Sequence, residues 1–155
     1  MPHIHKDIDF CVEVYITHQN KVLLRKHDKY KLWLSVGGHI ELDENPNEAA
    51  IREVKEEVGL KIEIIGKNEL PKLSADYTPL VPPKFMYIHE INSKHRHIAL
   101  VYFAKSETDK LVLSEREISE DCRWFSKEEL LENKFGVSEN VQFYARKALE
   151  ECETK

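Results

Sequence analysis

The stretch from residue 38 to residue 60 constrains the fold of this chain more than any other. It begins at the second of two adjacent glycines and carries a helical alternation of charged and apolar side chains. The apolar positions predict one buried stripe, because they recur at helical spacing at Ala50, Ile51, Val54 and Val58. The pattern indicates a turn at Gly37 and Gly38, followed by an amphipathic helix whose apolar stripe faces away from its acids.

Both ends of this helix carry capping signals. Asn45 is a favourable N-cap residue, Pro46 stands where a missing N–H costs nothing, and Glu48 can complete a capping box with Asn45. Gly59 supplies the stop signal at the other end. The sequence therefore predicts a helix that begins after Asn45 and ends at Gly59.

Three glutamates of the predicted helix, Glu53, Glu56 and Glu57, are neighbours on its surface because they are three or four residues apart. Like charges at this spacing destabilise an isolated helix. A solvated acidic face is the ordinary explanation of such a run, but it does not account for the adjoining glycine pair. A bound hard divalent cation accounts for both features, since it prefers carboxylate oxygens.

The same stretch resembles the Nudix box, G-x5-E-x7-R-E-U-x-E-E-x-G-U, where U is an aliphatic residue. It matches every defined position, at Gly38, Glu44, Arg52, Glu53, Val54, Glu56, Glu57, Gly59 and Leu60. Two nearby positions depart from common usage: Val36 stands where many members have proline, and Asp43 where many have glycine. Neither position holds a metal ligand in the family, so the departures concern the geometry of the turn.

The resemblance implies a metal-dependent pyrophosphohydrolase that acts on a nucleoside diphosphate linked to another moiety. It implies that Mg²⁺ or Mn²⁺ is held by the Gly38 carbonyl and by the carboxylates of Glu53, Glu56 and Glu57. Arg52 is expected to orient a glutamate by ion pairing. Metal ions help such a reaction because they neutralise phosphate oxygens and lower the pKa of bound water.

Candidate roles follow for individual residues. The catalytic set is Arg52, Glu53, Glu56 and Glu57, with Glu56 or Glu57 as the first choice for the general base. Three later acids are the outside candidates for that base, namely Glu115, Glu117 and Glu120. The candidate substrate-binding residues are Arg25, Glu44 and Tyr77. Tyr77 lies near the position of a tyrosine in diadenosine-polyphosphate hydrolases of the family.

Two other functions remain open. Some Nudix-like domains sense nucleotides without turnover, although these typically lose box acids that this chain keeps. Isoprenyl diphosphate isomerisation is a further activity of Nudix-like folds, but it needs a catalytic cysteine, and neither Cys11 nor Cys122 lies in a matching motif.

Composition sets the broader limits. The 155 residues, with 41% hydrophobic and 33% charged side chains, fit one domain over residues 1–155. The net charge of −5 argues against a nucleic-acid polymer as partner. The three cysteines predict neither a disulfide framework nor a CxxC metal site. We expect a cytoplasmic protein with no membrane partner that acts on a small-molecule nucleotide derivative and can form a homodimer.

The rest of the chain is rich in strands. Strand patterns occupy 8–17, 21–26, 61–65, 85–91, 97–104 and 123–125, and a second long helix is expected from Ser138 to about Glu151. A proline-punctuated loop is expected over 69–83. His95 and His97 alternate on one strand face, a spacing compatible with a transition metal, but the sequence shows no third ligand. The predicted fold is α/β (α+β), a Nudix-like α-β-α sandwich with a mixed β-sheet.

Overall fold

The computed structural model describes residues 3–28, 30–113 and 121–152. Within these ranges, eight strands form one sheet: β1 (Ile8–His18), β2 (Lys21–Lys26), β3 (Trp33–Leu34), β4 (Val36–His39), β5 (Ile62–Ile64), β6 (Phe85–Asn92), β7 (His95–Ser106) and β8 (Asp121–Ser126). Three helices accompany them: α1 (Pro46–Val58), α2 (Lys127–Glu132) and α3 (Glu139–Glu151). None of the described helices is long and apolar enough to span a membrane.

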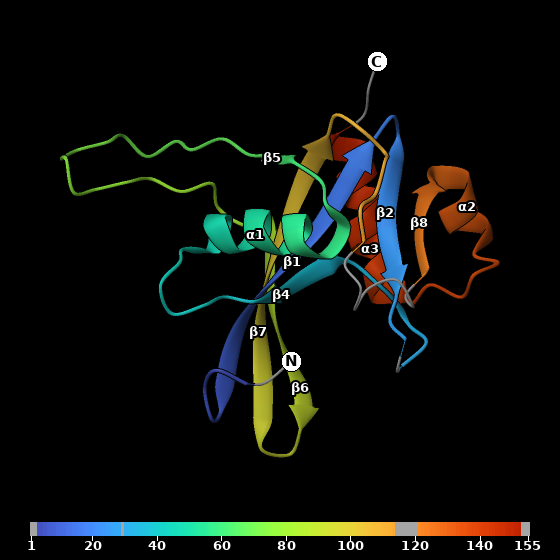
Figure 1. Ribbon diagram of the computed structural model, residues 1–155, viewed down its shortest axis with the longest axis horizontal. Helices are drawn as coiled ribbons and strands as arrows, with labels where there is room; N and C mark the ends of the chain where they lie inside the picture. The colour runs from blue at the N-terminus through green and yellow to red at the C-terminus, as the bar shows by residue number, and fades with distance from the viewer. Residues whose placement is uncertain (1–2, 29, 114–120, 153–155) are drawn as a thin grey trace.

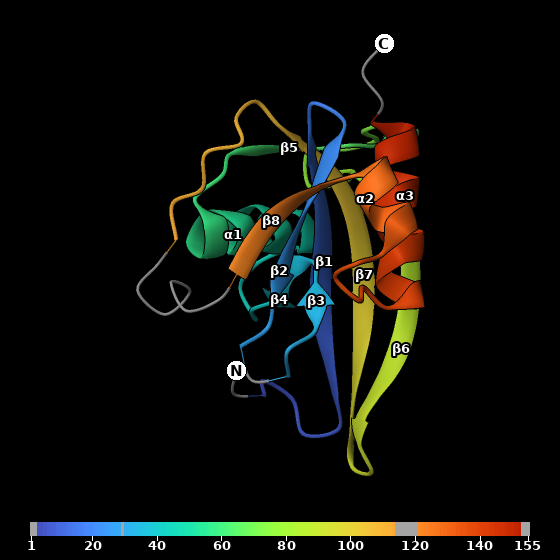
Figure 2. The same cartoon turned by 90° about the vertical axis from the view of Figure 1, so that its right-hand side faces the viewer.

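The sheet is mixed because its two central strands run parallel. β1 pairs in parallel with β7, and the other pairings of the described strands are antiparallel. The main strand order is β3-β2-β1-β7-β5, with β4 added on β1, β6 on β7 and β8 on β2. Helix α1 covers one face of the sheet, and α2 and α3 lie on the other (Figures 1 and 2). The predicted α-β-α sandwich is therefore confirmed.

Strand alternation divides the apolar core between the two faces. Val12 and Val14 of β1 pack with Val54 of α1 on one side. Tyr15 of the same strand packs with Ala145 of α3 on the other. Successive strand residues point to opposite faces of the sheet. In β1 and β7, the even-numbered core residues therefore face α1 and the odd-numbered core residues face α3.

The predicted ends of α1 are confirmed, but its predicted stripe is partly wrong. Asn45 accepts from the Glu48 backbone N–H at 2.9 Å in a full capping box, and Gly59 ends the helix at φ 70°. Ile51 is 47% exposed. The buried stripe instead consists of Ala49, Ala50, Glu53, Val54, Glu57 and Val58. A helix turns by about 100° per residue, which carries residue 51 past the sheet and brings two glutamates toward it.

The predicted glycine turn is also wrong, since both glycines lie within β4. Gly37 pairs with Glu13 and Gly38 with Val12 on β1. A Cβ on Gly37 would lie 2.1 Å from the Val12 carbonyl oxygen, so the position requires glycine for close backbone approach. β4 ends at His39, and the next residue, Ile40, donates its N–H to the Phe10 carbonyl of β1 at 2.8 Å.

Most of the other predicted elements are confirmed with small changes in their limits. The strands predicted at 85–91 and 97–104 correspond to β6 and β7, which pair as an antiparallel hairpin, with β7 beginning at His95. Ser126 and Glu129 form a capping box at the start of α2. The segment 65–84 has no helix or strand and extends past α1 as a long loop (Figure 1). All three cysteines lie among the described residues, and each is a free thiol.

Candidate active site

Arg52 lies at the centre of a network that joins α1 to the end of β4. Its Nε and Nη2 donate to the two carboxylate oxygens of Glu44, at 2.9 and 2.6 Å. Its Nη1 donates to Glu53 at 3.0 Å and to Glu56 at 3.1 Å. Nη2 also donates to the His39 carbonyl oxygen at 3.0 Å. One guanidinium thereby fixes three carboxylates, and we call Arg52, Glu44, Glu53 and Glu56 the Arg52 network.

The charges in this network influence one another. Hydrogen bonding to Arg52 holds the pKa of Glu44 below its usual value, and Glu44 in turn raises the pKa of Arg52. Burial raises the pKa of Glu53 in spite of the nearby Arg52 charge. A buried carboxylate with a raised pKa gains from additional positive charge, so the network favours a cation beside Glu53.

Glu57 is held from a different direction. Its carboxylate lies 3.3 Å from Arg25 Nη2 of β2 and accepts from the Gly37 N–H of β4 at 3.3 Å. Both side chains of the ion pair are largely buried, with 13% of Arg25 and 9% of Glu57 exposed. Arg25, expected to contact substrate, is thus found paired with a box carboxylate beside the glycines.

The donor set suits a hard cation. Glu53 and Glu57 lie on the buried side of α1, whereas the Glu56 side chain is 61% exposed. Among the described residues, the groups of three or more ligand atoms within 4.8 Å of one another do not include these three glutamates, whose carboxylates are held by Arg52 and Arg25. Carboxylate and backbone carbonyl oxygens are nevertheless the ligand types that Mg²⁺ and Mn²⁺ prefer.

The remaining candidates lie elsewhere. Tyr77 is 42% exposed in the long loop, where its N–H donates to the Ser74 carbonyl at 3.3 Å, and no described contact joins it to α1. The three outside candidates for the general base lie outside the described residues, namely Glu115, Glu117 and Glu120.

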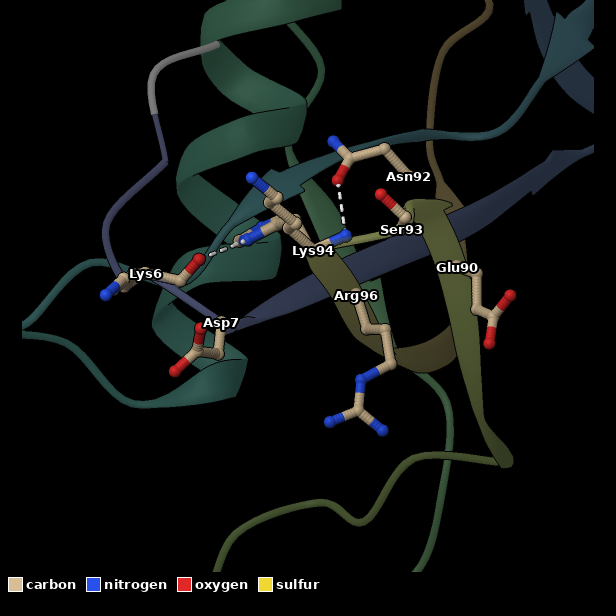
Figure 3. Close-up of a pocket in the computed structure, with 8 residues that line it drawn as sticks. Lys6, Asp7, Glu90, Asn92, Ser93, Lys94 and Arg96 are labelled. Carbon is tan, nitrogen blue, oxygen red and sulfur yellow. Dashed lines mark hydrogen bonds between the residues drawn. The ribbon is translucent and has the colours of Figure 1, made fainter.

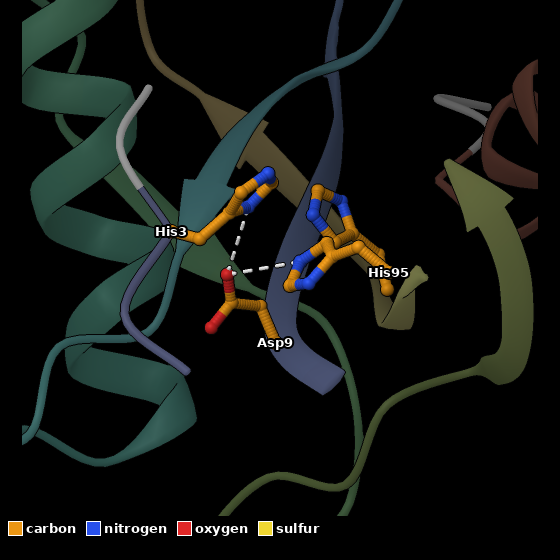
Figure 4. Close-up of side chains that lie close together, drawn as sticks. His3, Asp9 and His95 are labelled. Atoms are coloured by element: carbon orange, nitrogen blue, oxygen red, sulfur yellow. Dashed lines mark hydrogen bonds and ion pairs between the residues drawn. The ribbon is translucent and has the colours of Figure 1, made fainter. Parts of the chain in front are cut away.

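A second group of ionisable side chains lies around Asp9 and was missed by the sequence analysis. Asp9 Oδ2 lies 3.1 Å from His3 Nδ1, 3.3 Å from His95 Nε2 (Figure 4) and 3.6 Å from His39 Nε2. His97 stacks edge-on against the His39 and His95 rings. We call these five residues the Asp9 pocket. The alternation of His95 and His97 signalled two of its five members. Asp9 joins them through its parallel register with His97, and His39 through its antiparallel register with Cys11, and neither register has a local signature in the sequence.

Burial and mutual repulsion control protonation in the Asp9 pocket. Burial acts to raise the pKa of Asp9, but the His5 N–H and the His39 charge outweigh it and the pKa is lowered. Burial and the neighbouring histidines lower the pKa of His97 to about 4, and burial is also the main cause of a lowered pKa for His39. At neutral pH these two imidazoles are uncharged, with one lone pair each.

A shallow surface depression adjoins the Asp9 pocket at the tip of the β6–β7 hairpin. Lys6, Asp7, Glu90 and Arg96 are among the residues that line it (Figure 3). His95 forms part of its wall and donates from Nδ1 to the Lys6 carbonyl at 2.9 Å. The described residues that line the depression include no member of the Arg52 network.

Comparison with known proteins agrees with this geometry. The model of the NUDIX domain family matches residues 9–147. A NUDIX family hydrolase from Clostridium perfringens superposes with a TM-score of 0.84 at 35% identity, covering 94% of this chain and 98% of that one.

Two curated proteins are also similar. The m7GpppN-mRNA hydrolase NUDT17 of Xenopus laevis is 29% identical over 134 residues, which is 79% of this chain and 43% of that protein. The probable DHNTP pyrophosphohydrolase of Lactococcus lactis subsp. cremoris (strain MG1363) is 29% identical over 112 residues, which is 72% of this chain and 63% of that protein. The chain thus spans less than two thirds of the length of either protein. The NUDIX domain model, however, matches most of the present chain, from residue 9 to residue 147. The chain therefore belongs to the Nudix family.

Proposed function

We propose that this protein is a metal-dependent pyrophosphohydrolase that cleaves the phosphoanhydride of a nucleoside diphosphate linked to another moiety. The observation that carries the proposal is the Arg52 network, which holds three box carboxylates: Glu44 in the loop before α1, and Glu53 and Glu56 on α1 itself, a helix packed against β4. A similar protein named as a pyrophosphohydrolase supports it. Nudix hydrolases generally need a divalent metal.

The residues that would hold the metal are Glu53, Glu56, Glu57 and the Gly38 carbonyl. All four offer oxygen ligands, and the burial of Glu53 and Glu57 leaves their charge poorly solvated, which fits Mg²⁺ or Mn²⁺. When bound, such an ion neutralises phosphate oxygens and lowers the pKa of the attacking water.

The protein's own side chains would position the reaction. Arg52 is a positioning residue, because it fixes the directions of Glu53 and Glu56 while it is itself anchored on Glu44 and on the His39 carbonyl. Glu56 reaches solvent and can accept a proton from a water molecule, which makes it a candidate general base. Glu57 is the other candidate, and its ion pair with Arg25 would hold its carboxylate in place.

The test is a hydrolysis screen with Mg²⁺. Wild type, Glu56→Gln and Glu57→Gln are incubated with nucleoside triphosphates, ADP-ribose, diadenosine polyphosphates, DHNTP and capped RNA, and phosphate-containing products are separated. Glu63→Gln, an exposed glutamate on β5, is the matched control. Loss of the general base is expected to lower kcat by about 100-fold or more in one variant, with the control unchanged.

Two outcomes would overturn parts of this proposal. Equal turnover in wild type and both variants would remove the roles given to Glu56 and Glu57. Nucleotide binding by calorimetry with no product from any substrate would favour the alternative, a nucleotide-sensing domain without turnover. The substrate role of Tyr77, the single domain over 1–155, the cytoplasmic location and the homodimer stay predictions.

A further inference from the structure

We propose that His3, Asp9, His95 and His97 form a binding site for a borderline divalent transition metal, above all Zn²⁺. Each residue offers one ligand atom, and these four atoms all lie within 4.8 Å of one another. The set comprises three imidazole nitrogens and one carboxylate oxygen, which are ligands typical of zinc in proteins. This site is separate from the one proposed for hydrolysis.

The spacing of the ligand atoms fits one tetrahedral ion. Asp9 Oδ2 lies 3.1 Å from His3 Nδ1 and 3.3 Å from His95 Nε2 (Figure 4). Two ligands bound to zinc at about 2.0–2.1 Å with tetrahedral angles are roughly 3.3 Å apart. Both carboxylate–imidazole separations therefore match those of two ligands on a common ion, and the other pairs of ligand atoms lie within 4.8 Å.

His95 is oriented as metal-binding histidines usually are. Its side chain is 5% exposed, and its Nδ1 donates to the Lys6 carbonyl at 2.9 Å. That hydrogen bond places the proton on Nδ1 and leaves the lone pair of the neutral ring on Nε2. Nε2 is buried, points at the Asp9 carboxylate and has no hydrogen-bond partner among the described residues. Histidines that bind a metal through one ring nitrogen usually donate the other ring N–H to a carbonyl or carboxylate, which fixes the orientation of the ring.

His97 supplies the second buried nitrogen without a partner. Its Nε2 makes no hydrogen bond within the described part of the chain, and its ring lies 5.0 Å from both the His95 and the His39 rings. His97 also belongs to an overlapping group with Cys11 and His39. Buried polar atoms are nearly always paired in folded proteins. One cation would satisfy the unpaired nitrogens of both His95 and His97.

The proposed zinc site and α1 lie on opposite faces of the sheet. Asp9 and Cys11 have the parity of Tyr15, which packs with α3, whereas Val12 packs with α1. His39 is in register with Cys11, so its ring joins the Asp9 pocket even though its carbonyl accepts from Arg52. The His3 side chain is 43% exposed, which gives an ion a route in from solvent.

Cobalt provides the direct test, because Co²⁺ in a tetrahedral nitrogen site absorbs strongly in the visible region and octahedral oxygen sites do not. The full chain is titrated with Co²⁺ and then with Zn²⁺. We expect one cobalt ion to bind per chain at this site, and zinc to displace it. His95→Asn and His97→Asn are expected to weaken cobalt binding by about 100-fold or more, since even loss of an outer-shell partner costs 10- to 100-fold.

Matched controls separate a metal site from a structural cluster. Two exposed histidines serve as controls: His5, two residues after His3, and His89, which is paired with His97 between β6 and β7. The variants His5→Asn and His89→Asn should leave the cobalt spectrum unchanged. If a buried variant fails to fold, His3→Asn at the exposed rim keeps the test decisive. Absence of tetrahedral bands in wild type, or bands retained in every foldable variant of the site, would overturn the proposal. Because hydrolysis with Mg²⁺ is not the readout, that failure would leave the proposed function intact.

Discussion

The Arg52 network and the Asp9 pocket are arrangements of opposite sign on opposite faces of one sheet. In the network, a single guanidinium holds three carboxylates at 2.6 to 3.1 Å. In the pocket, a single carboxylate has three imidazole nitrogens at 3.1, 3.3 and 3.6 Å. Each cluster therefore has one central charge and a surplus of groups of the other kind.

The difference in ligand atoms between the two clusters indicates which metal ion each one can bind. A surplus of carboxylates offers oxygen ligands and negative charge, which suit Mg²⁺ or Mn²⁺. A surplus of imidazoles around one carboxylate offers nitrogen ligands, which suit Zn²⁺. The two clusters meet through β4, where the His39 carbonyl accepts from Arg52 and the His39 ring lies in the Asp9 pocket.

The largest expected effect is a loss of turnover that leaves cobalt binding on the other face of the sheet unchanged. Glu53→Gln removes a buried carboxylate charge from the network, and we expect kcat with Mg²⁺ to fall by roughly 100- to 1,000-fold, the usual cost of losing one preorganised electrostatic contact. The cobalt spectrum of the Asp9 pocket should not change, since the altered side chain lies on the α1 side of the sheet. Steady-state kinetics and a cobalt titration on the same preparation check this.

His95→Asn is the reciprocal control for Glu53→Gln. It should abolish the cobalt bands while turnover with Mg²⁺ remains within a factor of about two of wild type, because substitutions at sites that are not in contact usually act independently. The described contacts of the His95 side chain reach Asp9, Lys6 and the neighbouring histidine rings, and none reaches the Arg52 network. A fall of similar size in turnover for both variants would show that the two clusters act as one site, and the comparison would then fail.

A smaller effect, on stability, is expected from a substitution in β4, the strand that contributes to both clusters. Gly37→Ala would put a methyl group 2.1 Å from the Val12 carbonyl, so β4 must shift away from β1. Overpacking of this kind typically costs about 1–3 kcal/mol in the free energy of unfolding. Thermal unfolding should therefore begin several degrees lower, and both Mg²⁺-dependent turnover and cobalt binding should weaken together. Wild-type stability in this variant would contradict the close approach seen between β4 and β1.

The sequence predicts well those features whose signals lie close together along the chain. Asn45, Glu48 and Gly59 mark the ends of α1 within a few residues, and all three caps form as expected. Two of the three carboxylates of the Arg52 network, Glu53 and Glu56, come from the same helix. The grouping of these two follows from helical spacing alone, without knowledge of the rest of the fold.

Features that depend on strand register could not be predicted in this way. Nothing local shows that Gly37 approaches Val12, and a glycine pair resembles a turn until its partner strand is known. The Asp9 pocket has the same cause, since Asp9 and His97 become neighbours only through the parallel pairing of β1 with β7. The burial of Glu53 and Glu57 likewise depends on which side of α1 meets the sheet.

The smallest expected effect tests geometry within the network alone. Arg52→Lys keeps a positive charge but loses the planar fork that holds both oxygens of Glu44 while reaching Glu53 and Glu56. An ammonium group can satisfy only part of this arrangement, so the carboxylates would lose their fixed directions. We expect kcat to fall by about tenfold, the lower end of the effect of losing an outer-shell partner, with the Asp9 pocket unaffected. Arg123→Lys, at an exposed pair with Glu129, is the matched control and should leave kcat unchanged. Full activity in Arg52→Lys would mean that charge alone organises the network, and that the bidentate contact with Glu44 contributes nothing to the reaction.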